Sequence, residues 1–220
     1  TGSATYTGSE LSALVSGASN ALWANRATLV AAGTYSAFFT DIGVGGSFWF
    51  YSGGRWRPSA GRVTLKNLVT DVSNSAAPKV VMDYAMIPAG LWQDGDLIRA
   101  HICKERTGGT SDTDATDVML GSAALTLGTS LNLTTSGLAT TAISVAMDYA
   151  WRRVSSTSVR SQSVPGATGV GTSTSSNSII TGLTNMDSAD TYLQVTSDLT
   201  TAGGEVVWLR GYTVELIAGA

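Results

Sequence analysis

A strict alternation of apolar and polar side chains over residues 143–152 most restricts how this chain can fold. Its apolar residues occupy every second position: Ile143, Val145, Met147, Tyr149 and Trp151. Successive side chains of a β-strand point to opposite faces, whereas a helix would scatter these residues around its axis. We therefore expect a strand with one buried face, and with Asp148 on the other face.

Other segments share this period. We expect inward faces made by Val80, Met82, Tyr84 and Met86, by Ile98, Ala100 and Ile102, and by Tyr212, Val214 and Leu216, with a bulge at Gly211. The segments are joined by loops rich in Gly, Ser, Thr and Asp, notably 107–117 and 165–178. Evenly spaced strands with no convincing helix after residue 33 predict an all-β sandwich or jelly roll.

Residues 41–58, DIGVGGSFWFYSGGRWRP, predict an aromatic hairpin. Gly53-Gly54 joins SFWFYS to RWRP, and glycine pairs suit tight hairpin turns. Alternation places Phe48 and Phe50 on one face and Trp49 and Tyr51 on the other. Since both faces are apolar, we expect the hairpin to be enclosed by its own chain or by a neighbouring subunit.

The segment before the hairpin carries a weaker signal. Between Glu10 and Ala32, apolar residues fall at helical spacing, although Gly17, Ser19 and Asn20 weaken the pattern. A helix is predicted there, with a strand at the end of the segment as the alternative.

Composition excludes several classes of function. Charged residues make up 13% of the chain, the formal net charge is −3, and the basic residues are scattered, so nucleic acid is not an expected partner. Cys103 is the only cysteine, which excludes an intrachain disulfide and a cysteine-rich metal site. No apolar run approaches the roughly 20 residues that span a bilayer.

His101 and Cys103 are the first candidates for chemistry, because residues two apart on a strand share a face. Imidazole can activate a thiol, and a Ser-His-Asp triad would have to use His101, the only histidine. No nucleophile elbow, third orienting group or oxyanion loop is visible nearby. An outward or intersubunit histidine and a half-buried free cysteine are the predicted roles.

Two sets of acids invite other chemistry. Asp112, Asp114 and Asp117 have the alternation of a calcium loop, but the glycine and closing glutamate of an EF-hand are missing, so solvated loop acids are expected. Asp83 and Asp148 occupy equivalent places in two MDYA segments and would suit glycoside cleavage if they faced each other. Solvent or subunit contacts explain them as well, and no repeat of a depolymerase β-helix is present.

Trp92, Trp56 and Tyr35 could stack on sugars if exposed, although a core or interface role is expected for any single ring. No catalytic, cofactor-binding or metal-binding residue is therefore predicted.

Four stretches resemble a known family: residues 41–58, GRVTLKNL at 61–68, IPAGLWQDGDLIRAHICKERTGGTSDTDATDVMLG at 87–121, and DTYLQVTSDLTTAGGEVVWLRGYTVEL at 190–216. Together they look like the distal modules of tailed-bacteriophage structural proteins, with "IPAGL…DGD" and "TTAGGE" the most specific parts. The resemblance spans roughly residues 35–220. It implies a jelly-roll domain, usually trimeric, in tail fibres, receptor-binding proteins or head decoration proteins.

The prediction is an N-terminal attachment segment over 1–34, an aromatic hairpin over 35–60 and a jelly-roll domain over 61–220. The expected protein is a non-enzymatic homotrimer on the virion surface, attached to other virion proteins through residues 1–34. It would bind host surface carbohydrate as a tail fibre or receptor-binding module, with contacts carried by loops 107–117 and 165–178. The alternative is a decoration trimer that stabilises the capsid.

Overall fold

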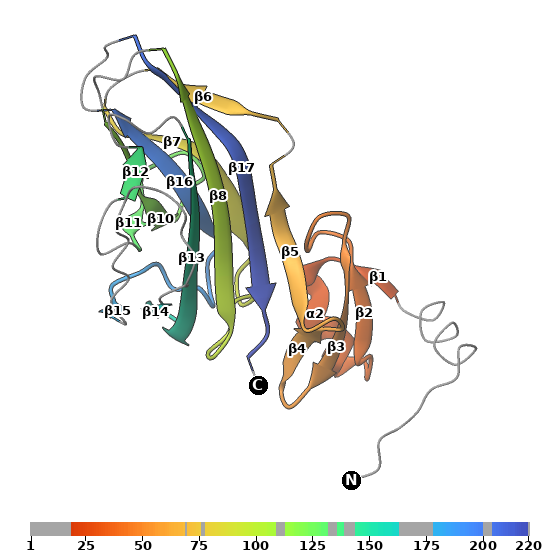
Figure 1. Cartoon of the computed structure of the whole chain (residues 1–220). Helices are drawn as coiled ribbons and strands as arrows, with labels where there is room; N and C mark the ends of the chain where they lie inside the picture. The colour runs from red at the N-terminus through yellow and green to blue at the C-terminus, as the bar shows by residue number, and fades with distance from the viewer. Residues whose placement is uncertain are drawn as a thin grey trace. The chain divides into compact units, whose positions relative to one another are not determined.

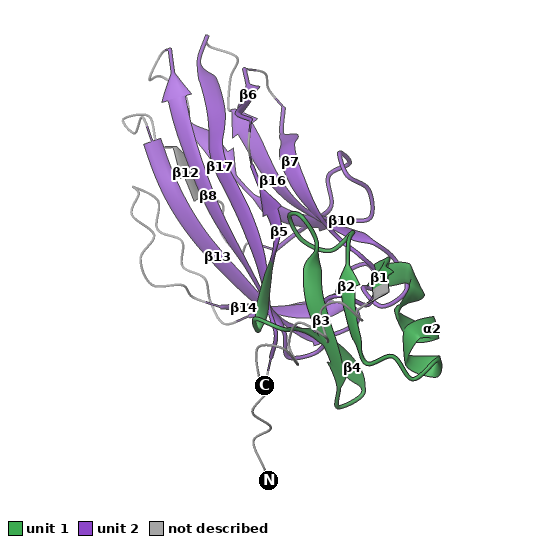
Figure 2. Ribbon diagram, turned by 90° about the vertical axis from the view of Figure 1, so that its right-hand side faces the viewer, with its two compact units in different colours: residues 1–63 green, residues 64–220 purple. Residues whose placement is uncertain are grey.

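The computed structural model describes residues 19–68, 70–75, 78–108, 113–131, 136–138, 144–162, 178–199 and 204–219. These residues are almost entirely strands and loops, with one short α-helix (Figure 1). The chain forms two compact units, residues 1–63 and 64–220 (Figure 2). The first unit is small, and the second contains both sheets of a sandwich.

The first unit is a four-stranded sheet in the order β1-β2-β3-β4. Its elements are β1 (Ser19–Ala21), a 3-10 turn (Trp23–Asn25), α2 (Arg26–Ala31), β2 (Ser36–Phe39), β3 (Ser47–Ser52) and β4 (Arg55–Pro58). The predicted hairpin is confirmed: β3 pairs with β4, and Gly53 and Gly54 have φ of 61° and 82°. Such angles are easy only for glycine, so this turn depends on its glycine pair.

The predicted helix over 10–32 is wrong for most of its described part. Residues 10–18 lie outside the described residues, Ser19–Ala21 form β1, and only Arg26–Ala31 are α-helical. No residue of α2 is buried, so its apolar spacing does not mark a core face. Pairing of β1 with β2 satisfies the backbone where Ser19 and Asn20 weaken a helix.

The two faces of the aromatic hairpin differ. Trp49 is buried and lies 5.2 Å from the ring of Trp23 and 6.4 Å from that of Phe39. On the other face Phe48 and Phe50 meet edge to face at 5.3 Å, and Phe50 remains 39% exposed. The chain therefore packs one face of the hairpin thoroughly and leaves the other partly open.

The second unit contains two antiparallel sheets. The large sheet has the order β15-β14-β13-β8-β17-β5, with β6 also beside β17. Its strands are β5 (Arg62–Asn67, which begins at the end of the first unit), β6 (Val72–Asn74), β8 (Leu97–Thr107), β13 (Ser144–Ser155), β14 (Ser158–Gln162), β15 (Ile179–Ile180) and β17 (Val206–Ile217). The small sheet contains β7 (Val80–Ile87), β9 (Asp114–Thr116), β10 (Val118–Gly121), β11 (Thr129–Ser130), β12 (Ser136–Leu138) and β16 (Thr191–Leu199).

The pairing of these strands is that of a jelly roll. β5 lies beside β17, β7 beside β16, β8 beside β13, and β10 beside β11. Counted along the chain, the first of these eight strands pairs with the eighth, the second with the seventh, the third with the sixth and the fourth with the fifth. This nested pairing, divided over two sheets, is the topology of a jelly roll. The predicted all-β jelly-roll sandwich is confirmed.

The core lies between the two sheets (Figure 1). The predicted inward faces on β8 and β17 are correct, and Val145, Met147, Tyr149 and Trp151 of β13 are buried as well, while Ile143 lies outside the described residues. The hydroxyl of Tyr212 on β17 donates across the core to the carbonyl oxygen of Leu193 on β16, at 2.7 Å. The pairing of β17 with β8 shifts register between Leu209 and Gly211, which confirms the expected bulge.

The predicted inward face of β7 is wrong for Tyr84 and Met86, although Met82 is buried as predicted. Met86 is 43% exposed and Tyr84 is half-buried, whereas Asp83, Ala85 and Ile87 are buried. Residues 80–87 are apolar at almost every position, so alternation selects neither face clearly. The inward carboxylate of Asp83 is tolerated because it accepts from Lys66 Nζ at 2.9 Å and from the Tyr84 amide at 2.7 Å.

The "DGD" stretch is a structural loop that leads into β8. Asp96 accepts the Gln93 amide at 3.1 Å and the Gly219 amide at 2.8 Å. Its carbonyl oxygen accepts Trp92 Nε1 at 3.1 Å and the Arg153 amide at 2.9 Å. The motif therefore ties the entry of β8 to β13 and to the chain after β17.

Candidate functional site

The outward face of the large sheet gathers three of the residues considered for chemistry. On β8, inward Ile98, Ala100 and Ile102 alternate with outward Arg99, His101 and Cys103. Strand register places His101 opposite Asp148 of β13 and Thr213 of β17. It likewise places Cys103 opposite Ala146 and Gly211.

Asp148, His101 and Cys103 form a continuous chain of polar contacts. Asp148 Oδ1 lies 3.1 Å from His101 Nδ1, and His101 Nε2 lies 3.2 Å from Cys103 Sγ. A carboxylate only accepts hydrogen bonds, so it favours the imidazole tautomer with the proton on Nδ1. Nε2 is then free to accept the thiol proton.

Sequence reasoning missed Asp148 as the group that orients His101. No orienting partner for His101 and Cys103 is visible nearby in the sequence, yet Asp148 supplies one from 47 residues away. Alternation correctly placed Asp148 and His101 on outward faces. Only the pairing of β8 with β13 brings the two together, and no local pattern encodes that pairing.

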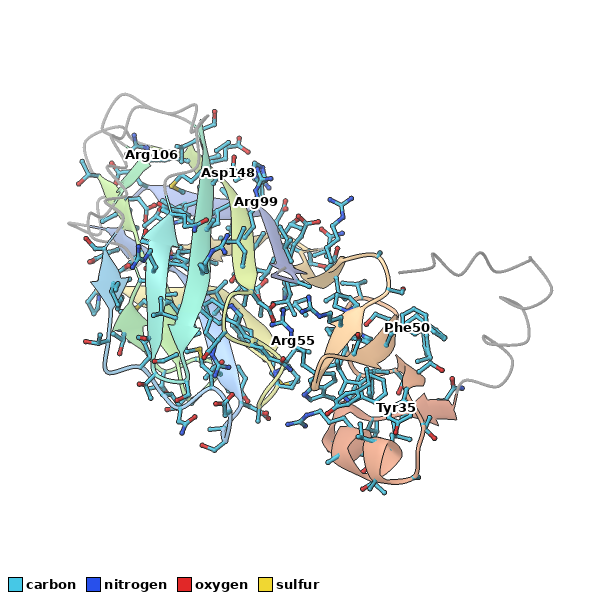
Figure 3. All side chains as sticks on the ribbon, turned by 90° about the horizontal axis from the view of Figure 1, so that it is seen from below. Tyr35, Phe50, Arg55, Arg99, Arg106 and Asp148 are labelled. Carbon is cyan, nitrogen blue, oxygen red and sulfur yellow. The ribbon has the colours of Figure 1, made fainter. Side chains whose placement is uncertain are left out.

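Arg99 contacts the same oxygen of the Asp148 carboxylate as His101 does. Its Nη2 donates to Asp148 Oδ1 at 3.2 Å, and Figure 3 shows the two side chains next to each other. The side chains of Arg99 and His101 are 46% and 47% exposed, while that of Asp148 is 17% exposed. The carboxylate is thus sheltered beneath two solvated partners, which keeps it oriented toward the imidazole.

The electrostatics of Cys103 differ from those of a preformed thiolate. Partial burial, and secondly the charge of Asp148, raise the pKa of the Cys103 thiol above its ordinary value. The thiol is therefore protonated at neutral pH, and any nucleophilic role requires His101 to remove its proton during the reaction.

Small residues flank Cys103 on both neighbouring strands. A Cβ built on Gly211 would lie 3.3 Å from Cys103 Cβ and 3.6 Å from Sγ, so the glycine leaves that side of the sulfur uncovered. Ala146 occupies the equivalent place on β13. Gly211, Cys103 and Ala146 thus form a cross-strand row of small side chains. The next row, Thr213, His101 and Asp148, has larger side chains.

Arg210 and Glu105 lie beside Cys103 on the side away from His101. Arg210 Nε donates to Glu105 at 2.7 Å, its Nη1 pairs with Asp71, and its guanidinium lies 4.7 Å from the ring centroid of Trp208. These contacts hold Arg210 along the sheet surface at the bulge. Its pKa is raised, chiefly by the hydrogen bonds to Asp71 and Glu105, and it stays charged.

The acids of the predicted calcium loop have other roles. Asp112 lies outside the described residues. Asp114 is buried and accepts from Lys104 Nζ at 2.7 Å, while Asp117 accepts from Ser130 Oγ at 2.6 Å. The expectation of solvated loop acids is therefore wrong for Asp114 and Asp117, since both carboxylates face protein donors in the interior.

The suggested carboxylate pair for glycoside cleavage is also wrong. Asp83 belongs to β7 of the small sheet and points into the sandwich toward Lys66. Asp148 belongs to β13 of the large sheet and lies on its outward face with His101. Since the large sheet lies between the two carboxylates, they cannot flank one glycosidic bond.

Of the three aromatic candidates for sugar stacking, one is exposed. Trp92 and Trp56 are buried, at 0% and 5% exposure, whereas Tyr35 is 56% exposed. The Tyr35 ring stacks on Tyr51 with centroids 6.1 Å apart, and Tyr51 in turn meets Trp56 at 5.6 Å. The aromatic core of the first unit thus reaches the surface at Tyr35 (Figure 3). The predicted contact loops lie in part outside the described residues, at 109–112 and 165–177.

The described part of the chain contains no group of three His, Cys, Asp or Glu side chains placed to hold a metal ion. Within the same residues, no helix combines the length and apolar character needed to cross a bilayer. Comparisons with protein-family models, with curated proteins and with solved structures find no match.

Proposed function

We propose that this chain is a non-enzymatic structural protein of a tailed-bacteriophage virion that adheres to host surface glycan as a tail fibre or receptor-binding module. The proposal is supported by the resemblance of residues 41–58, 61–68, 87–121 and 190–216 to such modules. A rigid jelly roll with long loops is suited to presenting adhesive surfaces. Attachment to other virion proteins would use residues 1–34.

The observation that carries the adhesive role is the exposed ring of Tyr35. Sugars bind through apolar ring faces and polar rims, and a Tyr ring supplies both an apolar face and a hydroxyl. Stacking on Tyr51 holds the ring in place, which limits the entropy lost on binding. Such a site is weak alone, so we propose that a homotrimer displays three copies and gains avidity from them.

Binding of the full chain to host cells, with and without Tyr35→Ala, tests this proposal. We expect loss of a single stacking ring to lower retention on host cells by up to about tenfold, in line with about 0.5–1.5 kcal/mol for such a contact. Val44→Ala is the matched control, because Val44 is 62% exposed in the same unit but has no ring. Equal retention of the two variants, or a monomer in sedimentation equilibrium, would contradict the glycan site or the trimer respectively.

The second candidate, a capsid decoration protein, is favoured by the open face of the aromatic hairpin. Phe48 and Phe50 present a half-covered apolar surface, which suits contact with another protein better than contact with sugar. This role predicts saturable binding to emptied phage heads, abolished by Phe50→Asp and unaffected by Tyr35→Ala. Absence of binding to heads would exclude it.

A further inference from the structure

We propose that Cys103 is a nucleophile activated by His101, and that it accepts an acyl group from an activated ester or thioester at the surface of the large sheet. This inference goes beyond the adhesive role and is independent of it. It assigns a covalent modification site to a residue that sequence reasoning left as a free, half-buried cysteine.

The geometry contains the three parts that such a nucleophile needs. The thiol of Cys103 and Nε2 of His101 are 3.2 Å apart, and Nδ1 of His101 is 3.1 Å from Asp148 Oδ1. A nucleophile in contact with a base, and a base oriented by a third group, is the arrangement by which weak nucleophiles are activated. The three side chains come from two paired strands, which hold them more firmly than a loop would.

An acyl donor can approach the sulfur because the neighbouring side chains are small. Gly211 has no side chain, and Ala146 only a methyl group, in the same row as Cys103. A larger residue at 211 would crowd the cysteine, since even a Cβ there would lie 3.3 Å from Cys103 Cβ and in contact with Sγ at 3.6 Å. The reactive atom is therefore open on the two sides that face Gly211 and Ala146.

The reaction balances on these groups alone. As the sulfur attacks the acyl carbon, the S–H bond breaks and the proton passes to His101 Nε2. The new S–C bond forms, the bond from the acyl carbon to the leaving oxygen or sulfur breaks, and the leaving group can take the proton from imidazolium. Asp148 stabilises the imidazolium in between without itself being protonated.

The same structure limits this chemistry to a single transfer. β8 is paired on both sides, with β13 and with β17, so the backbone amides around Cys103 are engaged in the sheet. The described residues around the thiol therefore offer no free pair of amides to stabilise an oxyanion, a contribution typically worth about a hundredfold or more in rate. The acyl group is expected to stay on the sulfur.

Charged side chains lie around His101 on three strands. Arg99 and Glu105 share its face of β8, Asp148 faces it from β13, and Arg210 and Glu215 lie along β17. Imidazole side chains lose their proton between about pH 5 and 8, whereas an ordinary thiol ionises near pH 8.5. A base-activated thiol should therefore react at pH values where a plain thiol is still inert.

The test is acetylation of the full chain by p-nitrophenyl acetate, followed by nitrophenolate release and intact mass. We expect one equivalent of nitrophenolate per chain, a mass increase of one acetyl group, and a rate that is already high at pH values where a plain thiol is inert. His101→Gln should lower the rate constant at pH 7 by about a hundredfold. Asp148→Asn should lower it as well, and Cys103→Ala should abolish the acetylation.

The matched control is a plain thiol on the same sheet, made by Val154→Cys in a Cys103→Ala background. Val154 is 42% exposed on the outward face of β13, beyond the residues that pair with β8. Its rate should rise only as ordinary thiols ionise, near pH 8.5. The proposal is overturned if the rate of the unaltered chain depends on pH in the same way as that of the control thiol, a comparison that needs no variant at His101. It is also overturned if His101→Gln reacts within twofold of the unaltered chain. Repeated turnover would overturn the limit to a single transfer.

Discussion

Tyr212 places a phenol hydroxyl in the middle of the sandwich, where burial and then the charge of Asp83 raise its pKa well above 10. The folded chain therefore keeps this proton at pH values where the unfolded chain loses it. The stabilisation is fully present below about pH 10 and is lost as the pH rises further. A single residue thus makes the core sensitive to alkali.

Tyr212→Phe should remove that sensitivity. At pH 7 we expect a loss of about 1 kcal/mol in the free energy of unfolding, because the hydrogen bond to Leu193 is gone. Above pH 10 the variant should lose less stability with each further step in pH than the unaltered chain. Urea unfolding between pH 7 and 11 measures both effects, with Tyr84→Phe on the outer face as the control. Parallel pH curves for the two chains would contradict the prediction.

Lys104 and Asp114 are a buried ion pair, with side chains 0% exposed. The amino group also donates to the Thr196 carbonyl at 2.7 Å, and burial lowers the pKa of Lys104 although Asp114 opposes this. Removing one partner leaves a buried charge uncompensated, so Lys104→Met should lower the free energy of unfolding by about 3–5 kcal/mol. Adding Asp114→Asn should recover part of that loss. A double-mutant cycle in urea checks this, and purely additive losses would contradict it.

Elements with a clear period were predictable from the sequence, and elements with a degenerate pattern were not. The alternation on β8 and on β17 specified the buried face of each strand. Gly211 marked the bulge, where the buried positions of β17 change from odd to even residue numbers. On β7 both parities are apolar, so only the contact between Asp83 and Lys66 shows which face turns inward. The site follows the same rule, because each strand places its residues correctly but only strand pairing joins His101 to Asp148.

The connection between β10 and β11 depends on a single side chain. Gln194 of β16 donates through Nε2 to the carbonyl oxygens of Ala123 and Thr126, at 2.8 and 2.7 Å, and its Oε1 accepts the Gly128 amide. The segment 122–128 carries Leu125, which is 70% exposed, so few apolar contacts hold it otherwise.

Gln194→Ala should loosen this connection without unfolding the sandwich. We expect a loss of about 1–3 kcal/mol in the free energy of unfolding, from the loss of several part-buried hydrogen bonds. Amide exchange at Gly128 should accelerate while exchange within β8 stays unchanged. Gln93→Ala is a control for loss of a glutamine elsewhere, since Gln93 makes one side-chain bond, to the Gly90 carbonyl at 3.3 Å. Uniform acceleration along both sheets would contradict a local role.

At the scale of the whole molecule, the strand pairs fall into two separate sets, one in each unit. Strands β1 to β4 pair only with one another among the described elements, and the jelly roll completes both of its sheets from β5 onward. Composition and loops were enough to predict an all-β class, but the order of strands in a sheet depends on long-range pairing that no local pattern records.

Residues 61–220 should therefore fold without the first unit. We expect this fragment to unfold in one cooperative step, with β-sheet circular dichroism and buried-tryptophan fluorescence, because its core residues all belong to it. A cut before Arg62 leaves β5 intact. A fragment beginning at residue 69 is the control, since it lacks β5 and exposes an edge of β17. An unfolded or aggregated 61–220 fragment would contradict this division.

The central place of β17 has a consequence for how the protein is made. The strand lies between β5 and β8 in the large sheet, yet it is the last strand of the roll to leave the ribosome. Until β17 is synthesised and pairs with both strands, the edges of β5 and β8 that face it have unpaired backbone groups. Nascent chains would accordingly remain vulnerable to proteases and dependent on chaperones until that moment.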